Sequence, residues 1–375
     1  MDIPAGTALT GFWSRPLFRL QKRKLSDIIT PVTIPRIIFL LLLRWITDMW
    51  CFFWFMVLTL TTLIFPRLAA AQGETLYHLV TGGQEVCHVE KKQSLNFLAL
   101  EKGLRPWVLA KQTKLKVDTL LKPGTVLKFD TTHIVPTELT DGLVVNLPER
   151  LVYQFYMGVY QRRYAIAVGK KTWQTPTGLY KIVNKEENPT WTVPVSIQEE
   201  MEDMGWKVLE KVPPGPKNPL GKYWIGTSGE NLGFHATNAP WSVGHAVSHG
   251  CMRMLPSEIA QLYPQVSVGD PVKIIYQPVK MALTPKGHIY LEAHPNIYDV
   301  KMDYLEYVKK MARSYQLESR IDWRKVDTVL KIRSGLAHDV TKESATVTDA
   351  VTPAPANKPR KLGLFPLQVQ SSRVE

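Results

Sequence analysis

A single stretch of the chain carries a cysteine and three histidines whose spacing could support chemistry. Cys251 is preceded, within sixteen residues, by His235, His245 and His249. A cysteine is a nucleophile only as the thiolate, and a nearby imidazole is the usual means of removing its proton near neutral pH. These residue types therefore predict acyl transfer through Cys251. The alternative is a buried structural thiol, since free cysteine is among the most buried residue types.

Small residues separate these side chains, among them Gly233, Ser248 and Gly250. Small residues before a cysteine allow backbone N–H groups to turn inward, where they can hold the negative oxygen of a tetrahedral intermediate. We expect the backbone of residues 249–251, that is His249, Gly250 and Cys251, to supply these donors.

The same stretch resembles the signature of the L,D-transpeptidase (YkuD-type) catalytic domain. The matching residues are His235, the block Ser248-His249-Gly250-Cys251, and Arg253. Residues 175–178, 188–191 and 214–221 resemble further blocks of that family, in the same order. The resemblance covers roughly residues 140 to 277. It departs from the family at Ala236, where glycine is common, and we expect the extra methyl group to be tolerated.

The resemblance implies a role for each residue. Cys251 would be the nucleophile, His235 the proton acceptor and donor, and His249 a residue that shapes the site by packing or hydrogen bonding. Spacing alone does not separate the two histidines, because both imidazoles could reach Cys251. Arg253 and Ser248 would bind substrate, since a guanidinium fork matches a carboxylate. The alternative for Arg253 is a structural salt bridge.

The resemblance also implies a substrate, the stem peptides of peptidoglycan. The Cys251 thiolate would attack before the terminal D-alanine of a tetrapeptide and form a thioester. An acceptor amine would then resolve it, giving a 3-3 cross-link or anchoring an outer-membrane lipoprotein. With water as acceptor, the enzyme would be an L,D-carboxypeptidase. A non-catalytic scaffold that binds peptidoglycan is the alternative from another class of function.

A metal site is the competing chemistry, because His245 and His249 have the i, i+4 spacing of zinc ligands on a helix. Gly244 and Gly250 bracket the pair and make a helix unfavourable, and no glutamate follows the first histidine. We therefore expect no metal and no cofactor. The three cysteines, Cys51, Cys87 and Cys251, lack the paired spacing of a disulfide framework, so Cys87 and Cys251 are expected to be reduced.

Charge narrows the class of partner. The formal net charge is +13, which suits an anionic partner such as nucleic acid, a membrane surface or an acidic polymer. No nucleic-acid-binding motif is present in the sequence, so we do not expect nucleic acid as a partner. The family resemblance implies peptidoglycan stem peptides and glycan as partners.

The N-terminal region predicts export. Residues 49–65 carry no charge and follow a leader, residues 1–44, that is rich in arginine and lysine. This pattern keeps the leader in the cytoplasm and places the rest of the chain in the periplasm. Residues 45–71 would be either an inner-membrane anchor or a cleaved signal, because the uncharged run is at the lower limit for a membrane span and small residues follow it.

Two folded domains are expected after this segment. Residues 74–135 show the order strand, helix, helix, strand, with helices near 94–101 and 107–112, and resemble a LysM domain. That resemblance implies binding to glycan chains, or a spacer of the same fold.

Residues 140–277 would form a mainly β catalytic domain. Short β-branched and aromatic strands at 143–147, 150–156 and 164–168 predict an all-β core, which the family resemblance makes a β-sandwich or barrel-like core. A helix is expected at 196–204, capped by Ser196, within a long proline-rich loop region. A second helix, at 256–263, would follow the cysteine motif, and a strand at 272–276 would close the domain.

Residues 278–334 would be a C-terminal extension with a hairpin and two helices, at 304–316 and 322–332. The tail, residues 335–375, is expected to be disordered, because it has few aromatic residues with which to bury apolar surface.

Overall fold

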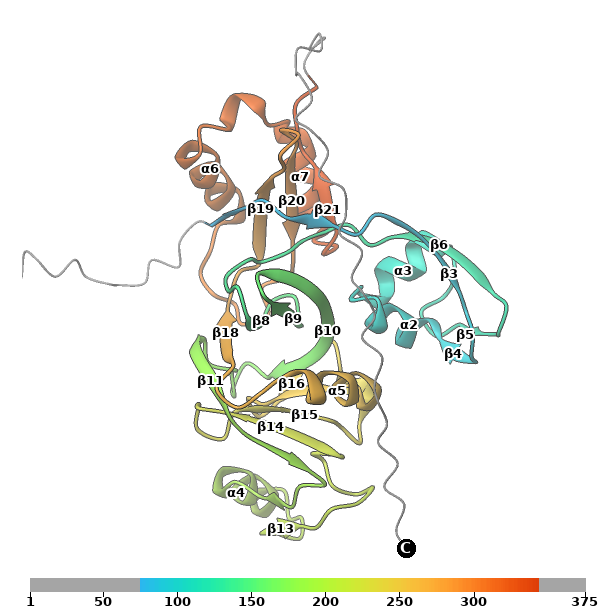
Figure 1. Ribbon diagram of the computed structural model, residues 1–375, viewed down its shortest axis with the longest axis vertical. Coiled ribbons are helices and arrows are strands. Elements are labelled where there is room, and N and C mark those ends of the chain that lie inside the picture. The colour runs from blue at the N-terminus through green and yellow to red at the C-terminus, as the bar shows by residue number, and fades with distance from the viewer. Residues whose placement is uncertain (1–74, 344–375) are drawn as a thin grey trace, which may run out of the picture. The chain divides into compact units, whose positions relative to one another are not determined.

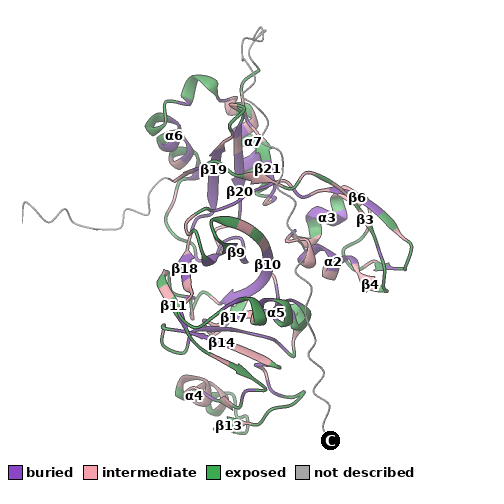
Figure 2. Cartoon of the chain, viewed as in Figure 1, coloured by how far each residue is buried: buried purple, intermediate pink, exposed green. Residues whose placement is uncertain are grey.

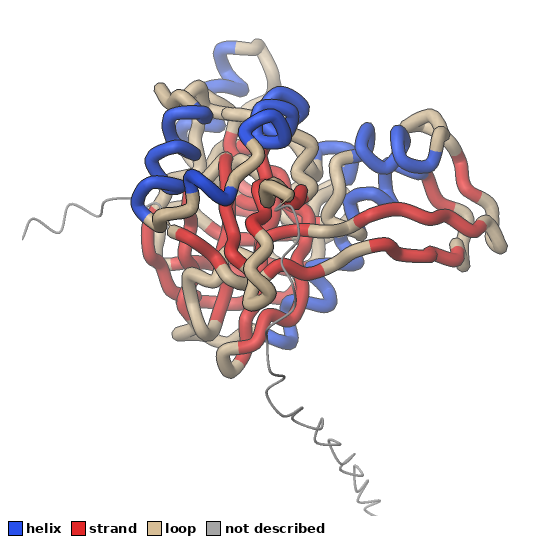
Figure 3. The backbone as a smooth tube through the Cα atoms, turned by 90° about the horizontal axis from the view of Figure 1, so that it is seen from above, coloured by secondary structure: helices blue, strands red, loops and turns tan. Residues whose placement is uncertain are grey.

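The computed structural model describes residues 75–343, and Figure 1 labels its elements. Strands make up much of the regular structure, as Figure 3 shows in red. No helix within residues 75–343 is long and apolar enough to cross a bilayer. The predicted leader, residues 1–44, the predicted membrane segment, residues 45–71, and the tail beyond residue 343 lie outside the described residues.

The domain expected at residues 140–277 is built on a nine-stranded sheet with the order β16-β10-β17-β15-β14-β11-β18-β8-β9. The long strand β10 also pairs with β9, so the sheet closes on itself into a barrel-like ring and the prediction of a mainly β core is confirmed. The strands are β8 Gly142–Asn146, β9 Leu151–Tyr156, β10 Val159–Gly169, β11 Gly178–Glu187, β14 Tyr223–Thr227, β15 Gly233–His235, β16 Ala246–Ser248, β17 Met252–Met254 and β18 Pro271–Ile275.

The inside of this ring is the main hydrophobic core, and its strands are mostly buried in Figure 2. Tyr164, Ile166 and Val168 of β10 are fully buried there, together with Phe234 of β15. The helix α5 (Pro256–Leu262) follows the cysteine motif, as predicted, and closes the core with Ile259 and Leu262. Short 3₁₀ turns lie at Pro240–Ser242, Tyr263–Gln265 and Glu318–Arg320.

A small excursion between β11 and β14 carries the only helix of the proline-rich region, α4 (Val195–Asp203). It lies beside the two-stranded hairpin β12 (Trp191–Thr192) and β13 (Lys211–Val212). None of its residues is fully buried. The predicted Ser196 cap is wrong: the helix begins after Pro194 without a side-chain cap, one residue earlier than expected.

The N-terminal module contains the predicted order of strand, helix, helix and strand, in β3, α2, α3 and β6. Ser94 caps α2, accepting a hydrogen bond from the Phe97 N–H at 3.2 Å. Its elements are β3 Gln84–His88, β4 Gln93–Ser94, α2 Leu95–Glu101, α3 Pro106–Thr113, β5 Leu120–Leu121 and β6 Val126–Asp130.

The C-terminal extension forms its own four-stranded sheet, with the order β1-β19-β20-β21. The helices α6 and α7 pack on it around a second apolar core. Its elements are β1 Leu76–Tyr77, β19 Val279–Leu283, β20 Ile289–Ala293, α6 Tyr304–Ser314, α7 Trp323–Ile332 and β21 Ala337–Asp339.

Two predicted boundaries are wrong in this sheet. The disordered tail was expected from residue 335, yet β21 pairs with β20 and Val340 is buried. The first module was expected to begin at residue 74, yet β1 pairs with β19 of the C-terminal extension. A linking pair, β2 (Val80–Thr81) and β7 (His133–Ile134), lies next along the chain. The β1–β19 pairing joins Leu76 to Met281, about 200 residues further along the chain, and local sequence patterns do not predict such a contact.

Candidate active site

The residues of the cysteine motif converge on one cleft of about 410 Å³. All six sequence-predicted site residues line it: His235, Ser248, His249, Gly250, Cys251 and Arg253. They come from β15, β16 and β17 and from the loop between β16 and β17. Trp173, Trp191, Pro194 and Leu220 add apolar walls.

Strand alternation explains which side chains enter the cleft. In the parallel pair β15 and β17, Phe234 is opposite Met252 and His235 is opposite Arg253. Side chains of neighbouring residues point to opposite faces of a sheet. Phe234 and Met252 are fully buried in the core, so His235 and Arg253 share the opposite face, which borders the cleft.

The Cys251 thiol carries its proton near neutral pH, because its pKa is raised. Its Sγ donates to the backbone oxygen of Asn231 at 3.0 Å. Burial raises the pKa of the thiol to about 11, although the Gly233 backbone and the positive charge of Arg253 act in the opposite direction. Cys87 and Cys251 are both free thiols, as predicted.

His235 is buried and neutral. Burial and, to a lesser extent, Arg253 lower the pKa of His235 to about 4, while hydrogen bonding to the Ala236 and Pro219 backbones opposes the shift. Its Nδ1 lies 2.6 Å from the backbone oxygen of Ala236. Since a carbonyl oxygen only accepts, Nδ1 carries the proton and Nε2 is left as the proton acceptor.

His249 is held by a residue that sequence reasoning missed. Its Nε2 lies 2.5 Å from the Glu200 carboxylate on α4, and its ring meets the edge of Trp173 with centroids 5.3 Å apart. Glu200 also pairs with Lys170 at 2.9 Å. Hydrogen bonds from Lys170 and His249 lower the pKa of Glu200. The carboxylate therefore links α4 to residues 249–251, the loop between β16 and β17 that we call the cysteine loop.

The cysteine loop is ordered by internal hydrogen bonds. Ser248 Oγ donates to the Cys251 backbone oxygen at 2.5 Å and accepts from the Gly250 N–H at 3.2 Å. Buried Thr175 donates to the Gly250 oxygen at 2.7 Å and accepts from the Gly169 N–H at 2.9 Å. Gly250 has a φ of 112°, a conformation that favours glycine.

These bonds change two expectations. The Ser248 hydroxyl is engaged within the loop, and the residue is only 1% exposed, so it orders the loop instead of offering a free group to substrate. The Gly250 N–H, one of the three backbone donors expected for an oxyanion, already donates to Ser248 Oγ within the loop. Thr175 lies in a family-like block, but no pattern assigned it this contact.

Arg253 is partly buried at the cleft, and burial lowers its pKa. Within residues 75–343 its guanidinium forms no ion pair with a carboxylate, so the structural salt bridge considered from the sequence is not observed there. Its fork remains available to a ligand.

His245 does not join His249 in a common site. His245 is exposed and borders a different recess, whereas His249 lines the cleft with Cys251. The zinc pair that the spacing suggested is therefore not assembled in this structure.

Comparison with known proteins gives a consistent family. Residues 140–274 match the model for the L,D-transpeptidase catalytic domain, YkuD. The chain is similar to the probable L,D-transpeptidase YcfS of Escherichia coli, with 27% identity over 75% of this chain and 88% of that protein. It is similar to the probable L,D-transpeptidase ErfK/SrfK of Escherichia coli, with 32% identity over 60% of this chain and 75% of that protein. For the probable L,D-transpeptidase YbiS of Escherichia coli, identity is 35% over 48% of this chain and 59% of that protein.

Proposed function

Because this chain belongs to the L,D-transpeptidase family, we propose that it is a peptidoglycan transpeptidase that forms an acyl-enzyme on Cys251. The observation that carries the proposal is the cleft itself. It brings together the partly buried thiol of Cys251, the neutral imidazole of His235 and the guanidinium of Arg253, which has no carboxylate partner within residues 75–343.

The resting pair is a neutral thiol and a neutral imidazole, because burial disfavours the charged form of each. On binding a stem tetrapeptide, His235 Nε2 takes the thiol proton as Sγ attacks the carbonyl before the terminal D-alanine. The bond to D-alanine then breaks, the imidazolium returns the proton to the leaving amine, and a thioester remains on Cys251.

The developing oxyanion needs donors that are already in place. The amides of His249 and Cys251 supply them, in a loop that Ser248 and Thr175 hold in shape. Arg253 binds a carboxylate of the stem peptide through its fork.

Deacylation transfers the acyl group to an amine. The acceptor is a second stem peptide, which gives a 3-3 cross-link, or a lysine of an outer-membrane lipoprotein. The walls formed by Trp173, Trp191 and Leu220 favour an organic amine over water. L,D-carboxypeptidase activity is the outcome if water is the acceptor instead.

The modules around the cleft suit a wall enzyme. We propose that the β3-α2-α3-β6 module is LysM-like and binds glycan, consistent with its order of elements. We also place the enzyme in the periplasm, anchored through residues 45–71 or released after their cleavage, on the basis of the charge pattern of the sequence.

Incubation of the purified chain with a disaccharide-tetrapeptide tests the proposal. Release of D-alanine together with a cross-linked dimer is expected. Release of D-alanine with only the disaccharide-tripeptide as second product indicates the carboxypeptidase. Retention on sacculi without any D-alanine release contradicts catalysis and leaves the scaffold function.

A further inference from the structure

A second recess, of about 370 Å³, lies at the opposite end of β16 from the cysteine cleft. Ala246, the first residue of β16, borders this recess, and Ser248, the last, borders the cleft. We call it the arginine recess. The lining residues used below are Leu100, Arg105, Trp107, Arg150, His245 and His294.

Two guanidinium groups enter the arginine recess without a carboxylate partner. Neither Arg105 nor Arg150 forms an ion pair with any carboxylate in the described part of the chain. Arg105 donates only to the backbone oxygen of Arg333, at 2.9 Å. Burial, and secondarily the charge of Arg105, lower the pKa of Arg150 to about 10. Like charges brought together and partly desolvated are costly unless an anion joins them.

The backbone of Arg150 is unusual as well. It has a φ of 57° in the turn between β8 and β9, a left-handed conformation that glycine and asparagine adopt most readily. An arginine held there is a strained choice for a turn, and such strain clusters at functional sites. Arginine at this position is explained if its guanidinium group is needed in the recess, since its backbone preference does not suit the turn.

Beside Arg150 lies a fully buried cluster of charges. Lys280 Nζ lies 2.8 Å from Glu149 and 2.9 Å from Glu292, and His294 Nε2 lies 2.6 Å from Glu292. Glu149 also accepts from Tyr153 at 2.5 Å, so its carboxylate is occupied and does not neutralise Arg150. Glu149 and Glu292, two of the three potential metal ligands in this cluster, thus already bind a cation, the Lys280 ammonium.

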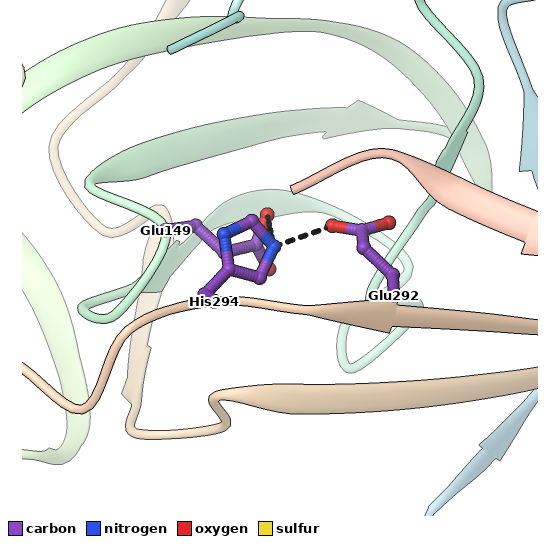
Figure 4. Close-up of side chains that lie close together, drawn as sticks. All are labelled: Glu149, Glu292 and His294. Atoms are coloured by element: carbon purple, nitrogen blue, oxygen red, sulfur yellow. Dashed lines mark hydrogen bonds and ion pairs between the residues drawn. The ribbon is translucent and has the colours of Figure 1, made fainter. Parts of the chain in front are cut away.

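His294 leaves one polar atom unsatisfied at the arginine recess. Both contacts to the carboxylates are made by the same ring nitrogen, Nε2, and Nδ1 lies on the side of the ring away from Glu292 (Figure 4). His294 lines the recess and is 3% exposed, and its Nδ1 has no hydrogen-bond partner among residues 75–343.

We propose that the arginine recess is a second binding site, which takes a carboxylate carried by the peptidoglycan substrate. The carboxylate binds Arg150 and Arg105, which both line the recess. Leu100 and Trp107 contact the adjoining carbon skeleton. The assignment of the carboxylate to peptidoglycan rests on the proposed function, but the binding of a carboxylate by the two arginines does not.

The test compares Arg150→Asn with the parent in the full-length chain. Asparagine suits a left-handed turn, so this variant removes the charge without adding backbone strain. Arg150→Lys keeps the charge and is the matched control. Binding of a disaccharide-tetrapeptide is measured by calorimetry in a Cys251→Ala background, which prevents turnover. Binding of acetate alone is measured in the same proteins.

Arg150→Asn is expected to weaken muropeptide binding by roughly tenfold or more, the loss typical of a charged hydrogen bond. Arg150→Lys should lose much less. Equal affinity in Arg150→Asn and the parent overturns the proposal. Binding of acetate that depends on Arg150, while muropeptide binding does not, overturns the assigned source and identifies a free-anion site.

Carbapenem acylation of the Cys251-containing protein separates this proposal from the proposed function. Acylation should proceed equally in Arg150→Asn and the parent, because Arg150 lies outside the cleft. If neither protein is acylated while muropeptide binding still depends on Arg150, the transpeptidase assignment fails and the arginine recess stands.

Discussion

His235 and Arg253 are opposite each other on the parallel strands β15 and β17. Burial is the main cause of the low pKa of His235, about 4, and the adjacent positive charge of Arg253 lowers it further. The imidazole is therefore neutral at pH 7 and able to accept a proton. The same guanidinium favours the thiolate of Cys251, opposing part of the effect of burial. The charge of Arg253 thus lowers the pKa of both His235 and Cys251.

This pairing predicts different behaviour for the two histidines of the cleft. His235→Ala should reduce acylation by roughly 10²- to 10⁴-fold, the range for a general acid–base group. The residual rate should rise with pH as the unassisted thiol ionises, with a pKa that burial raises to about 11. His249→Ala should lose activity through geometry and keep the pH profile of the parent.

The measurement is the rate of acylation by a carbapenem as a function of pH, in both variants. The assignment is reversed if His249→Ala shows the profile of an unassisted thiol and His235→Ala keeps that of the parent.

Glu200 should position His249 and hold α4 beside the cleft. Glu200→Ala removes its contacts with Lys170 and His249. We expect kcat/KM to fall about two- to fivefold, because a partly exposed charged pair contributes up to about 1 kcal/mol. Glu199→Ala, an exposed neighbour on the same helix, is the control and should leave kcat/KM unchanged. Equal values of kcat/KM in Glu200→Ala and Glu199→Ala would show that Glu200 does not position His249.

Thr175 should matter for both stability and catalysis. Thr175→Val keeps the shape but leaves the Gly169 N–H and the Gly250 oxygen without their buried partner. The free energy of unfolding should fall by about 1–3 kcal/mol. Acylation should also slow, because the cysteine loop loses the hydrogen bond that Thr175 donates to Gly250. Thr175→Ser retains the hydroxyl and should restore most of both. Denaturant unfolding and acylation rates measure the two effects, and a Thr175→Val protein with parental values of both would contradict the account.

Lys280 neutralises two buried carboxylates, so Lys280→Met should destabilise the fold by about 3–5 kcal/mol. Burial alone would raise the pKa of Glu292, but the Lys280 charge and the His294 hydrogen bond hold it well below its usual range. A carboxylate with a lowered pKa stabilises the fold above its unfolded pKa, about 4.3, and this stabilisation is lost as pH falls.

The parent should therefore lose this stabilisation as pH falls below about 4, and the difference in unfolding free energy between Lys280→Met and the parent should shrink as pH falls. Lys301→Met, at an exposed position of the same module, is the control and should stay within about 0.5 kcal/mol of the parent. A loss of similar size in both variants would show that the charge cluster has no special role.

Local pattern was sufficient for much of the fold. The alternation and β-branched composition near residues 143–168 predicted β8, β9 and β10, and proline with Glu258 at the first turn predicted α5. The cysteine motif also predicted which side chains line the cleft, because its residues lie close together in the chain.

Contacts between distant segments were not predictable. Glu200 lies 49 positions before His249, and Thr175 lies 75 positions before Gly250. Neither contact can be predicted from hydrophobic periodicity, because that pattern reports only neighbours within one helix or strand. The tryptophans show the same limit, because Trp173 and Trp191 line the cleft and Trp224 contacts His235, whereas Trp206 and Trp241 are exposed.

The most direct test of the central claim is the mass of the intact full-length chain after incubation with a carbapenem, followed by mapping of the modified peptide. The account predicts one adduct per chain, located on Cys251 and absent from Cys251→Ser, with Cys87→Ser acylated like the parent. An adduct that persists in Cys251→Ser, or one that maps to Cys87, would contradict the assignment of Cys251 as the nucleophile.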